Sequence, residues 1–335
     1  MSKKFINGKS ILVTGGTGSF GTKFCETVLK NYNPARLIIF SRDEMKQWEM
    51  QANFENDDRV RFFIGDVRDS DRLGIALRGV DYVIHAAAQK ILPIAEYNPF
   101  ECVKTNINGA SNIIDQCIRQ GVKKVVALST DKASSPCNLY GATKLVSDRL
   151  FIAGNSYSGK SGTIFSVVRY GNVMGSRGSV IPFFYKLGQE GKDIPITDPE
   201  MTRFMISLEQ GIDLVIKSLN ESKGGEIFVK KIPSMNIVDI ANTVAPNAKH
   251  KIIGIRPGEK LHEEMIAKTD SAQTFEYNDY YKILPSIYNW RSDPKRLKGG
   301  KKVKNNFQYA SNTNSEWMTS RILTKWLNNN IGKIQ

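Results

Sequence analysis

The feature that most constrains the fold lies near the start of the chain, where a short apolar segment enters a glycine-rich turn. Residues 11–13 (Ile-Leu-Val) have the composition of a buried strand, and a helical pattern follows the turn and runs to Lys30. Glycines at this spacing, G-x-x-G-x-x-G, allow a tight turn and a close approach of the backbone to a pyrophosphate, while the helix N-terminus offers free N–H groups to the anion. A glycine triplet by itself can be only a turn, but its place between a first strand and a helix favours dinucleotide binding. The residues expected at this site are Thr14, Gly15, Thr17, Gly18, Ser19, Phe20 and Gly21.

Strand and helix patterns alternate from Ser10 to about Tyr170, which is typical of βαβ units around a parallel sheet. We therefore expect an α/β protein with a Rossmann-type, doubly wound parallel sheet in residues 1–170. After this point the alternation loosens. Residues 171–335 are expected to form mainly a smaller, non-contiguous substrate lobe, and segments near 204–230 are expected to return to the main sheet.

The end of the second expected strand, 36–40, indicates which dinucleotide is bound. NAD-specific sites of this type usually have an acidic side chain there, against the ribose 2′-hydroxyl. Here Ser41 and Arg42 follow the strand and Lys46 lies one helical turn further on, a set that suits a 2′-phosphate. NADP is therefore the expected cofactor, although a small shift of register would turn Asp43 toward the ribose. At the ends of the next two strands the expected cofactor contacts are Asp66, Val67, Ala86, Ala87 and Ala88.

Tyr140 and Lys144 are four residues apart, so they face the same side of an expected helix. An ammonium beside the phenol favours the phenolate, which brings a group with an ordinary pKa of about 10 closer to neutral pH. The apolar segment 123–129 precedes this helix, and the residues after it are expected at the carboxyl end of a strand, where ligands of open α/β sheets bind. Tyr-x-x-x-Lys alone is a weak signal and gains weight from the glycine motif upstream. The chain is thus expected to be an enzyme with Tyr140 and Lys144 as catalytic residues, and Thr130, Asp131 and Lys132 are expected beside them at the end of the strand.

Composition narrows the class of protein without deciding it. The chain has 335 residues and a formal net charge of +14, and its densest basic stretch is 295–304. This stretch lacks interleaved aromatic residues, so we expect a solvated loop and no nucleic-acid partner. No run of 18 apolar residues and no signal-peptide pattern is seen, and we expect a cytoplasmic protein without a membrane partner. The four cysteines and three histidines show no metal-ligand spacing, which predicts reduced thiols and no metal, and His85 is expected to be a packed strand-end residue.

Longer motifs carry a resemblance that covers nearly the whole chain. They are residues 128–132, 138–144, 169–173, 175–180, 197–203, 256–263 and 308–317. With these motifs the chain resembles the extended short-chain dehydrogenase/reductases, and among them the inverting UDP-N-acetylglucosamine 4,6-dehydratases that open pseudaminic acid biosynthesis. The discriminating pair is Asp131-Lys132. Retaining sugar-nucleotide 4,6-dehydratases have Asp-Glu at this position, and in 4-epimerases a Ser or Thr serves without an acid–base dyad.

The resemblance implies a reaction sequence at the sugar. Tyr140 takes the proton from O4, which Thr130 hydrogen-bonds, while hydride leaves C4 for NADP⁺ and a 4-ketone forms. A base then removes the acidified C5 proton, Asp131 protonates the departing C6 hydroxyl, and the hydride returns to C6. Reprotonation of C5 from the opposite face inverts this centre, with Lys132 as the acid–base group. The implied product is UDP-2-acetamido-2,6-dideoxy-β-L-arabino-hex-4-ulose.

The resemblance also implies ligand contacts and an assembly. Further cofactor contacts would be Lys90, Asn106, Tyr140, Lys144, Tyr170, Asn172 and Val173. Substrate contacts would be Lys90, Lys132, Asn172, Ser179, Val180, Thr197, Met201, Arg203, Arg256 and Glu259. A homo-oligomer, either a dimer or a hexamer, is expected.

Two alternatives stay open from the sequence. A UDP-N-acetylhexosamine 4-epimerase shares the cofactor, Tyr140 and Lys144 but needs no group at C5 or C6. A catalytically silent dinucleotide-binding protein whose basic face docks a partner belongs to another class, although it has no need to keep Thr130, Tyr140 and Lys144 together. The residue that first takes the C5 proton is also left open.

Overall fold

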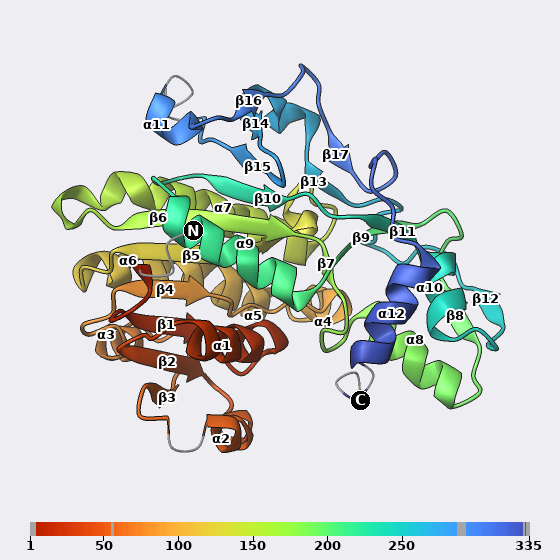
Figure 1. The fold of residues 1–335 in the computed structure, drawn as a ribbon, viewed down its shortest axis with the longest axis horizontal. Helices are drawn as coiled ribbons and strands as arrows, with labels where there is room; N and C mark the ends of the chain where they lie inside the picture. The colour runs from red at the N-terminus through yellow and green to blue at the C-terminus, as the bar shows by residue number, and fades with distance from the viewer. Residues whose placement is uncertain (1–4, 55–56, 287–292, 331, 333–335) are drawn as a thin grey trace.

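The computed structural model describes residues 5–54, 57–286, 293–330 and 332. Its centre is a 10-stranded sheet with the strand order β16-β14-β15-β10-β6-β5-β4-β1-β2-β3 (Figure 1). The strands of this sheet are β1 (Ser10–Thr14), β2 (Arg36–Ser41), β3 (Val60–Ile64), β4 (Tyr82–His85), β5 (Lys124–Thr130), β6 (Ile164–Tyr170), β10 (Ile227–Lys230), β14 (Thr274–Glu276), β15 (Tyr280–Ile283) and β16 (Lys301–Lys302).

Seven neighbouring strands of this sheet, from β3 to β10, are parallel. Their middle residues read as continuous apolar runs because helices cover both faces, and Ile11, Leu12 and Val13 are fully buried. The strand order 3-2-1-4-5-6 within it is that of doubly wound nucleotide-binding sheets. In such sheets the strands are added first on one side of β1 and then on the other, so the strand order reverses between β1 and β4. The predicted fold class is confirmed.

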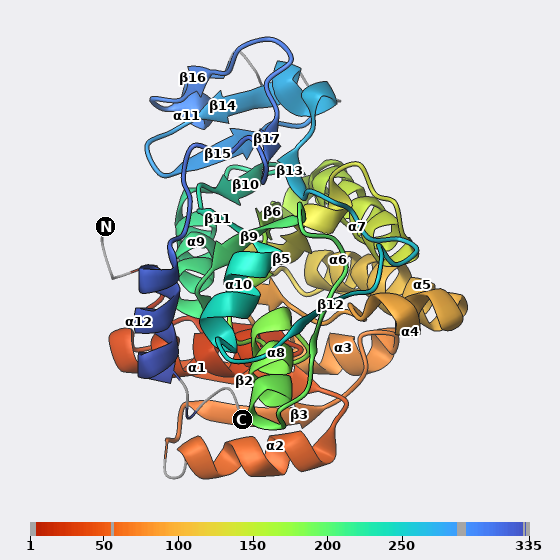
Figure 2. The same cartoon turned by 90° about the vertical axis from the view of Figure 1, so that its right-hand side faces the viewer.

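Helices lie in a layer on each face of the sheet (Figure 2). One layer contains α1 and α9, which contact each other, and the other contains α3, α6 and α7. The helices that follow the parallel strands or connect them are α1 (Ser19–Asn31), α2 (Glu44–Gln51), α3 (Ser70–Ala76), α4 (Leu92–Tyr97), α5 (Pro99–Val103), α6 (Gly109–Arg119), α7 (Leu139–Tyr157) and α9 (Leu208–Glu221).

Segments from the second half of the chain return to the main sheet. α9 packs on β5 and β6, and β10 pairs in parallel with β6. β9 (Thr202–Ile206) lies instead in a small sheet with β7 (Asn172–Val173) and β11 (Ser234–Asn236). The antiparallel strands β14, β15 and β16 extend the main sheet further. Sequence patterns did not predict this extension, because these strands are short and pair only with one another and with β10.

A second, smaller hydrophobic core lies beside the carboxyl ends of the parallel strands (Figure 1). It is built by α8 (Val180–Gln189), β8 (Ile194–Ile196), α10 (Ile237–Val244) and α12 (Ser320–Asn330), and β12 (His250–Ile252) pairs with β8 at its edge. The remaining elements are β13 (Glu264–Ile266), α11 (Pro294–Leu297) and β17 (Tyr309–Ala310), of which β13 and β17 pair with each other. The lobe is therefore assembled from three separate stretches of chain, the last of which is the C-terminal helix.

Among the helices of the described residues, none has the length and the apolar character needed to cross a lipid bilayer.

Candidate active site

A cleft of about 1130 Å³ opens at the carboxyl ends of β1, β2, β4 and β5 and continues to the smaller lobe. Pockets for one small ligand usually measure about 300–1,000 Å³, so this cleft has room for more than one ligand. Most of the predicted site residues line it. They are Gly15, Thr17, Gly18, Ser19, Phe20, Gly21, Ser41, Arg42, Lys46, Asp66, Val67, Ala86, Ala87, Ala88, Lys90, Thr130, Asp131, Lys132, Tyr140, Lys144, Tyr170, Asn172, Val173, Ser179, Arg256 and Glu259.

The glycine turn after β1 forms one end of the cleft from bare backbone. Gly15 has a φ of +63°, and a Cβ atom there would lie 2.9 Å from the Cα of Ala87. A Cβ on Gly21 would lie 2.5 Å from the carbonyl oxygen of Gly16. Gly18 precedes α1 and provides no side-chain cap, so the first N–H groups of this helix are open to an anion. The turn has the shape and polarity that a pyrophosphate requires.

The end of β2 carries the positive charge that the sequence predicted. Arg42 lies 3.5 Å from the carboxylate of Asp66, and Lys46 pairs with Asp43. Asp43 also caps α2, because its carboxylate accepts a hydrogen bond of 3.0 Å from the backbone N–H of Lys46. Both contacts of the Asp43 carboxylate are thus with Lys46 of α2. Burial opposes ionisation of Asp66, but hydrogen bonds from Arg68 outweigh it and hold the pKa of this carboxyl below its ordinary value.

Thr130, Tyr140 and Lys144 meet at the end of β5. Thr130 ends this strand, and Tyr140 lies in the first turn of α7 and forms a hydrogen bond with Thr130. Burial raises the pKa of Tyr140 to about 12, although the charge of Lys132 and the bond with Thr130 act in the opposite direction. The ammonium of Lys144 donates a hydrogen bond of 2.6 Å to the carbonyl oxygen of Leu128. The expected lowering of the tyrosine pKa by Lys144 is thus not seen in this structure, because burial dominates at the phenol.

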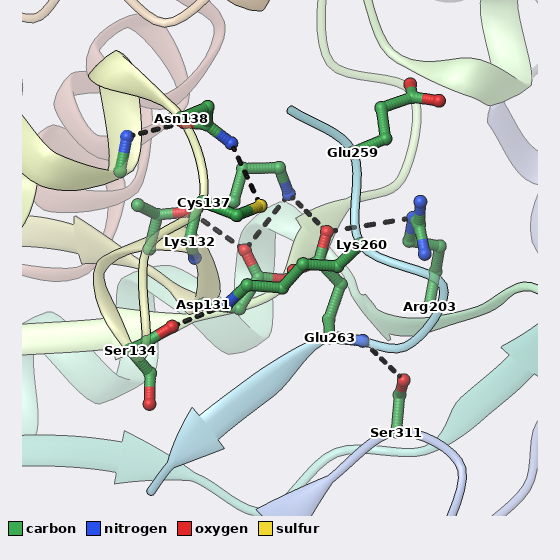
Figure 3. A network of polar contacts seen from close by, with 12 residues as sticks. Asp131, Lys132, Ser134, Cys137, Asn138, Arg203, Glu259, Lys260, Glu263 and Ser311 are labelled. Atoms are coloured by element: carbon green, nitrogen blue, oxygen red, sulfur yellow. Dashed lines mark hydrogen bonds and ion pairs between the residues drawn. The ribbon is translucent and has the colours of Figure 1, made fainter. Parts of the chain in front are cut away.

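Asp131 and Lys132 form a buried ionic cluster with a third residue, Glu263 (Figure 3). The lysine ammonium lies 3.2 Å from Asp131 Oδ1 and 2.9 Å from Glu263 Oε1. Burial acts to lower the pKa of Lys132, but the two carboxylates outweigh it and raise this pKa above its ordinary value. The pKa of Asp131 is also raised, chiefly by burial. Both groups are therefore biased toward their protonated forms.

Several polar atoms on the cleft wall are buried and lack a hydrogen-bond partner within the described part of the chain. They include Asp131 Oδ2, Asn172 Oδ1, Ser179 Oγ and Glu259 Oε2. Buried polar atoms are nearly always hydrogen-bonded in folded proteins. Their gathering on one wall indicates a surface prepared for a polar ligand.

Two predicted cofactor residues lie behind the cleft wall. The Thr14 hydroxyl accepts from the backbone N–H groups of Ala86 and Ala87 and is 2.8 Å from Nδ1 of His85. The side chain of Asn106 exchanges two hydrogen bonds of 2.9 Å with the backbone of Gln89. Both residues thus hold the loop after β4 in place. His85 is buried and its pKa is lowered to about 3, first by burial, as suits a packed neutral histidine.

Four predicted substrate residues do not line the cleft in this structure. Val180 begins α8 and packs against the core of the smaller lobe, whereas the preceding Ser179 lines the cleft. Thr197, Met201 and Arg203 form a buried group of their own. The sulfur of Met201 accepts from Thr197 Oγ1 at 3.1 Å and from Arg203 Nη2 at 2.8 Å.

Arg177 and Glu263 are polar residues of the site to which sequence reasoning gave no role. Arg177 lines the cleft, where its backbone N–H donates to Ser19 Oγ and its carbonyl oxygen accepts from Lys90. A charged residue between the glycines of the motif 175–180 was the available signal. Glu263 ended the motif 256–263 but received no role, because nothing in a local pattern indicates its contact with Lys132, which lies far earlier in the chain. Within the described residues, no group of three or more metal-ligating side chains is found.

Comparison with known proteins shows the family of this chain. Residues 11–285 match the family described as "Polysaccharide biosynthesis protein". The chain belongs to this family. The match includes the glycine turn, Thr130 to Lys144 and the 256–263 motif, and thus most of the cleft.

Individual relatives are similar over most or all of their length. A "UDP-N-acetylglucosamine 4,6-dehydratase (inverting)" of Campylobacter jejuni subsp. jejuni is 56% identical, over 98% of this chain and 99% of the relative. A "UDP-glucose 4-epimerase" of Rickettsia canadensis is 42% identical, over 82% of each chain. The X-ray structure of Pen from Bacillus thuringiensis aligns with a TM-score of 0.90 and 38% identity, covering 99% of this chain and 100% of that one.

Proposed function

We propose that the protein is an NADP-dependent UDP-N-acetylglucosamine 4,6-dehydratase that inverts C5. The observation that carries the proposal is the pair Asp131 and Lys132, held beside Thr130 and Tyr140 on the wall of the cleft. A 4-epimerase oxidises C4 but needs no acid at C5 or C6, so a buried acid and a charged lysine at this point favour dehydration. The identity of 56% to an inverting dehydratase supports the same substrate.

NADP is the proposed cofactor, and the cleft residues fit it. The glycine turn and the open N-terminus of α1 suit the pyrophosphate, and Ser41, Arg42 and Lys46 suit a 2′-phosphate. When bound, NADP⁺ accepts a hydride from C4 of the sugar and returns it to C6. The proposed NADP-binding domain is residues 1–170 with returning segments near 204–230, and the proposed substrate lobe is mainly residues 171–335.

Tyr140 is the proposed base for the O4 hydroxyl, and Thr130 the proposed hydrogen-bond partner of O4. The charge of Lys132 lowers the pKa of this phenol, but the value of about 12 already includes that effect, so release of the proton near neutral pH requires further positive charge. Lys144 is the proposed second source, from one turn along α7. Its buried ammonium has a pKa lowered by desolvation.

Asp131 is the proposed acid for the departing C6 hydroxyl, and Lys132 the proposed acid for C5. The raised pKa of Asp131 supports this role, because a carboxyl group must hold a proton near neutral pH in order to donate it. Lys132 holds its proton at neutral pH, as a donor to C5 must, although its raised pKa makes it a weaker acid. Inversion results if this proton arrives on the face opposite the one from which the first was removed.

The nucleotide sugar is proposed to lie against the smaller lobe. Asn172, Ser179, Arg256 and Glu259 would contact it from this side, and Lys90 from the other. The unpartnered oxygens of Asn172, Ser179 and Glu259 support the assignment, since they are available to a polyhydroxylated ligand. Val180, Thr197, Met201 and Arg203 are proposed to support this wall from behind.

The proposed product is UDP-2-acetamido-2,6-dideoxy-β-L-arabino-hex-4-ulose, and the proposed context is the first step of pseudaminic acid biosynthesis in the cytoplasm. A homo-oligomer is proposed as the working form.

The test is to incubate the purified protein with UDP-N-acetylglucosamine and determine the mass of the product, with Tyr140→Phe as the inactive control. Loss of one water supports the dehydratase. A product of unchanged mass with the other configuration at C4 would instead identify an epimerase. No conversion by a folded, NADP-loaded protein would identify a silent binder.

A further inference from the structure

Glu263 is a buried carboxylate that the proposed reaction does not use directly. Its side chain is 2% exposed, and Oε1 lies 2.9 Å from the ammonium of Lys132 and 3.8 Å from Nε of Arg203 (Figure 3). It does not line the cleft, whereas Lys132 does. Glu263 is therefore connected to the cleft by its ion pair with Lys132.

The position of Glu263 is fixed by chain segments far from the catalytic strand. Its backbone N–H donates a hydrogen bond of 2.9 Å to Ser311 Oγ, and its carbonyl oxygen accepts one of 2.8 Å from the N–H of Ser311. Ser311 Oγ in turn lies 2.7 Å from Oγ1 of Thr202. The pairing of β13 with β17 continues this connection. A buried charge held from several sides is costly unless it has a defined partner, and Lys132 is the nearest cation.

The charges around Lys132 form a consistent set. Burial acts to raise the pKa of Glu263, but Lys132 and Arg203 outweigh it and lower this pKa, so the carboxyl is ionised. Asp131 has its pKa raised by burial and by the negative charge of Glu263, and it tends to hold a proton. The charged or titratable groups that face Lys132 or act on it are Asp131, Glu263, Arg203, Lys90, Tyr140 and, through Glu263, Lys260. Glu263 is the member whose fixed negative charge keeps the lysine protonated when Asp131 is neutral.

We infer that Glu263 is a positioning residue, which holds the Lys132 ammonium at the cleft wall as the proton donor for C5. This inference rests on the proposed dehydratase function. In the step, the N–H bond of the ammonium breaks and a C–H bond forms at C5 of the enolate that follows hydride return to C6. The 4-ketone is restored and a neutral amine remains beside Glu263. The amine regains its proton from water.

The experiment compares Glu263→Gln with the unmodified enzyme over a range of pH. Glutamine keeps the size of the side chain but removes the charge, so the pKa of Lys132 falls and its acid form is lost at lower pH. We expect the alkaline limb of the kcat profile to move by about one pH unit or more to lower pH. We also expect the loss of kcat relative to the unmodified enzyme to grow with pH along this limb, with little loss at pH 7 and KM within about threefold. Glu276→Gln is the matched control, because it breaks an exposed Lys–Glu pair far from the cleft and leaves the profile unchanged.

A role for Glu263 in folding alone predicts the same loss of kcat at every pH, and an unshifted alkaline limb would overturn the inference. If Glu263→Gln does not fold, an NMR titration of the unmodified protein with ¹³C-labelled lysine gives the answer, with the Lys132 signal assigned from Lys132→Arg. We expect this signal to titrate above the ordinary lysine pKa of about 10.4. A signal that titrates at or below this value would also overturn the inference. If the unmodified protein removes no water from UDP-N-acetylglucosamine, the proposed function fails, and the titration still tests the ion pair.

Discussion

Asp131 and Lys132 are adjacent in the chain, yet the fold biases both toward the protonated form. An isolated Asp–Lys pair would lower the carboxyl pKa, because each charge stabilises the other. Here Asp131 is almost fully buried and shares the lysine with Glu263, so burial and a like charge prevail at the carboxyl. Two carboxylates raise the pKa of Lys132 and the more distant guanidinium of Arg203 lowers it, and the effect of the carboxylates is larger. Two proton donors with different neighbours suit two successive protonations of one sugar.

Arg42 is the residue whose substitution tests the choice of cofactor. Its guanidinium lies at the end of β2, is half exposed and lines the cleft. We expect nucleotide-free protein to bind NADP⁺ more tightly than NAD⁺, and Arg42→Asp to narrow or reverse this preference by weakening the contact with a 2′-phosphate. Arg321→Asp makes the same change of charge on the exposed surface of α12 and is expected to leave the preference unchanged. Titration calorimetry with both nucleotides measures the preference. Equal affinities for NADP⁺ and NAD⁺ in the unmodified protein would contradict the proposal of NADP as the cofactor.

Helix α7 joins the catalytic tyrosine to the substrate wall through its capping residue. Asn138 Oδ1 accepts a hydrogen bond of 2.7 Å from the N–H of Gly141. Its Nδ2 donates one of 2.7 Å to the carbonyl oxygen of Gly258, in the loop that carries Arg256 and Glu259. One side chain thus sets the start of the helix and the distance between Tyr140 and the opposite loop.

Asn138→Ala is therefore expected to affect both stability and catalysis. Loss of an N-cap costs about 1 kcal/mol of unfolding free energy. Asn236→Ala is the matched control, because Asn236 caps α10 by a bond to the N–H of Val238 in the smaller lobe. We expect similar losses of stability in denaturant unfolding, but a fall in kcat of about tenfold for Asn138→Ala alone, since a displaced catalytic group costs rate. Equal kcat values for the two variants would show that the link to the Gly258 loop has no catalytic importance.

The elements differed in how far the sequence could predict them. The strand–turn–helix at Ile11 to Lys30 was predictable, because its apolar residues and its glycines are close together in the sequence. Helix α9 was predictable from the spacing of its apolar residues and from its capping residue Ser207. The strands β14 to β16 were not, since 2 to 4 residues carry too little periodicity. For the site, Thr130 to Lys144 follow from local motifs. Glu263 needed the fold itself, because its ion pair with Lys132 depends on strand pairing by the C-terminal segment.

At the scale of the whole molecule, the cleft is assembled from segments that are distant in sequence. The parallel sheet provides the glycine turn and the ends of β2 and β5, while the loops at 172–179 and 256–259 close the other side. Residues 309–311 hold the strand that follows Glu263. A reaction with several steps at adjacent carbons benefits from such an arrangement, because one bound sugar can meet different acids and bases without leaving the cleft.

This single-site arrangement predicts the fate of two labels. Hydride that leaves C4 returns to C6 of the same sugar, so substrate deuterated at C4 should give product deuterated at C6, and NADPH should not accumulate. The C5 proton comes from a side chain, and the Lys132 side chain is 20% exposed and exchanges with solvent, so product made in D₂O should contain deuterium at C5. NMR and mass spectrometry of the product measure both labels. An epimerase would give neither solvent label nor loss of water. Release of the C4 label to solvent, or a need for added NADPH in every turnover, would contradict the internal return of hydride on which the proposed function depends.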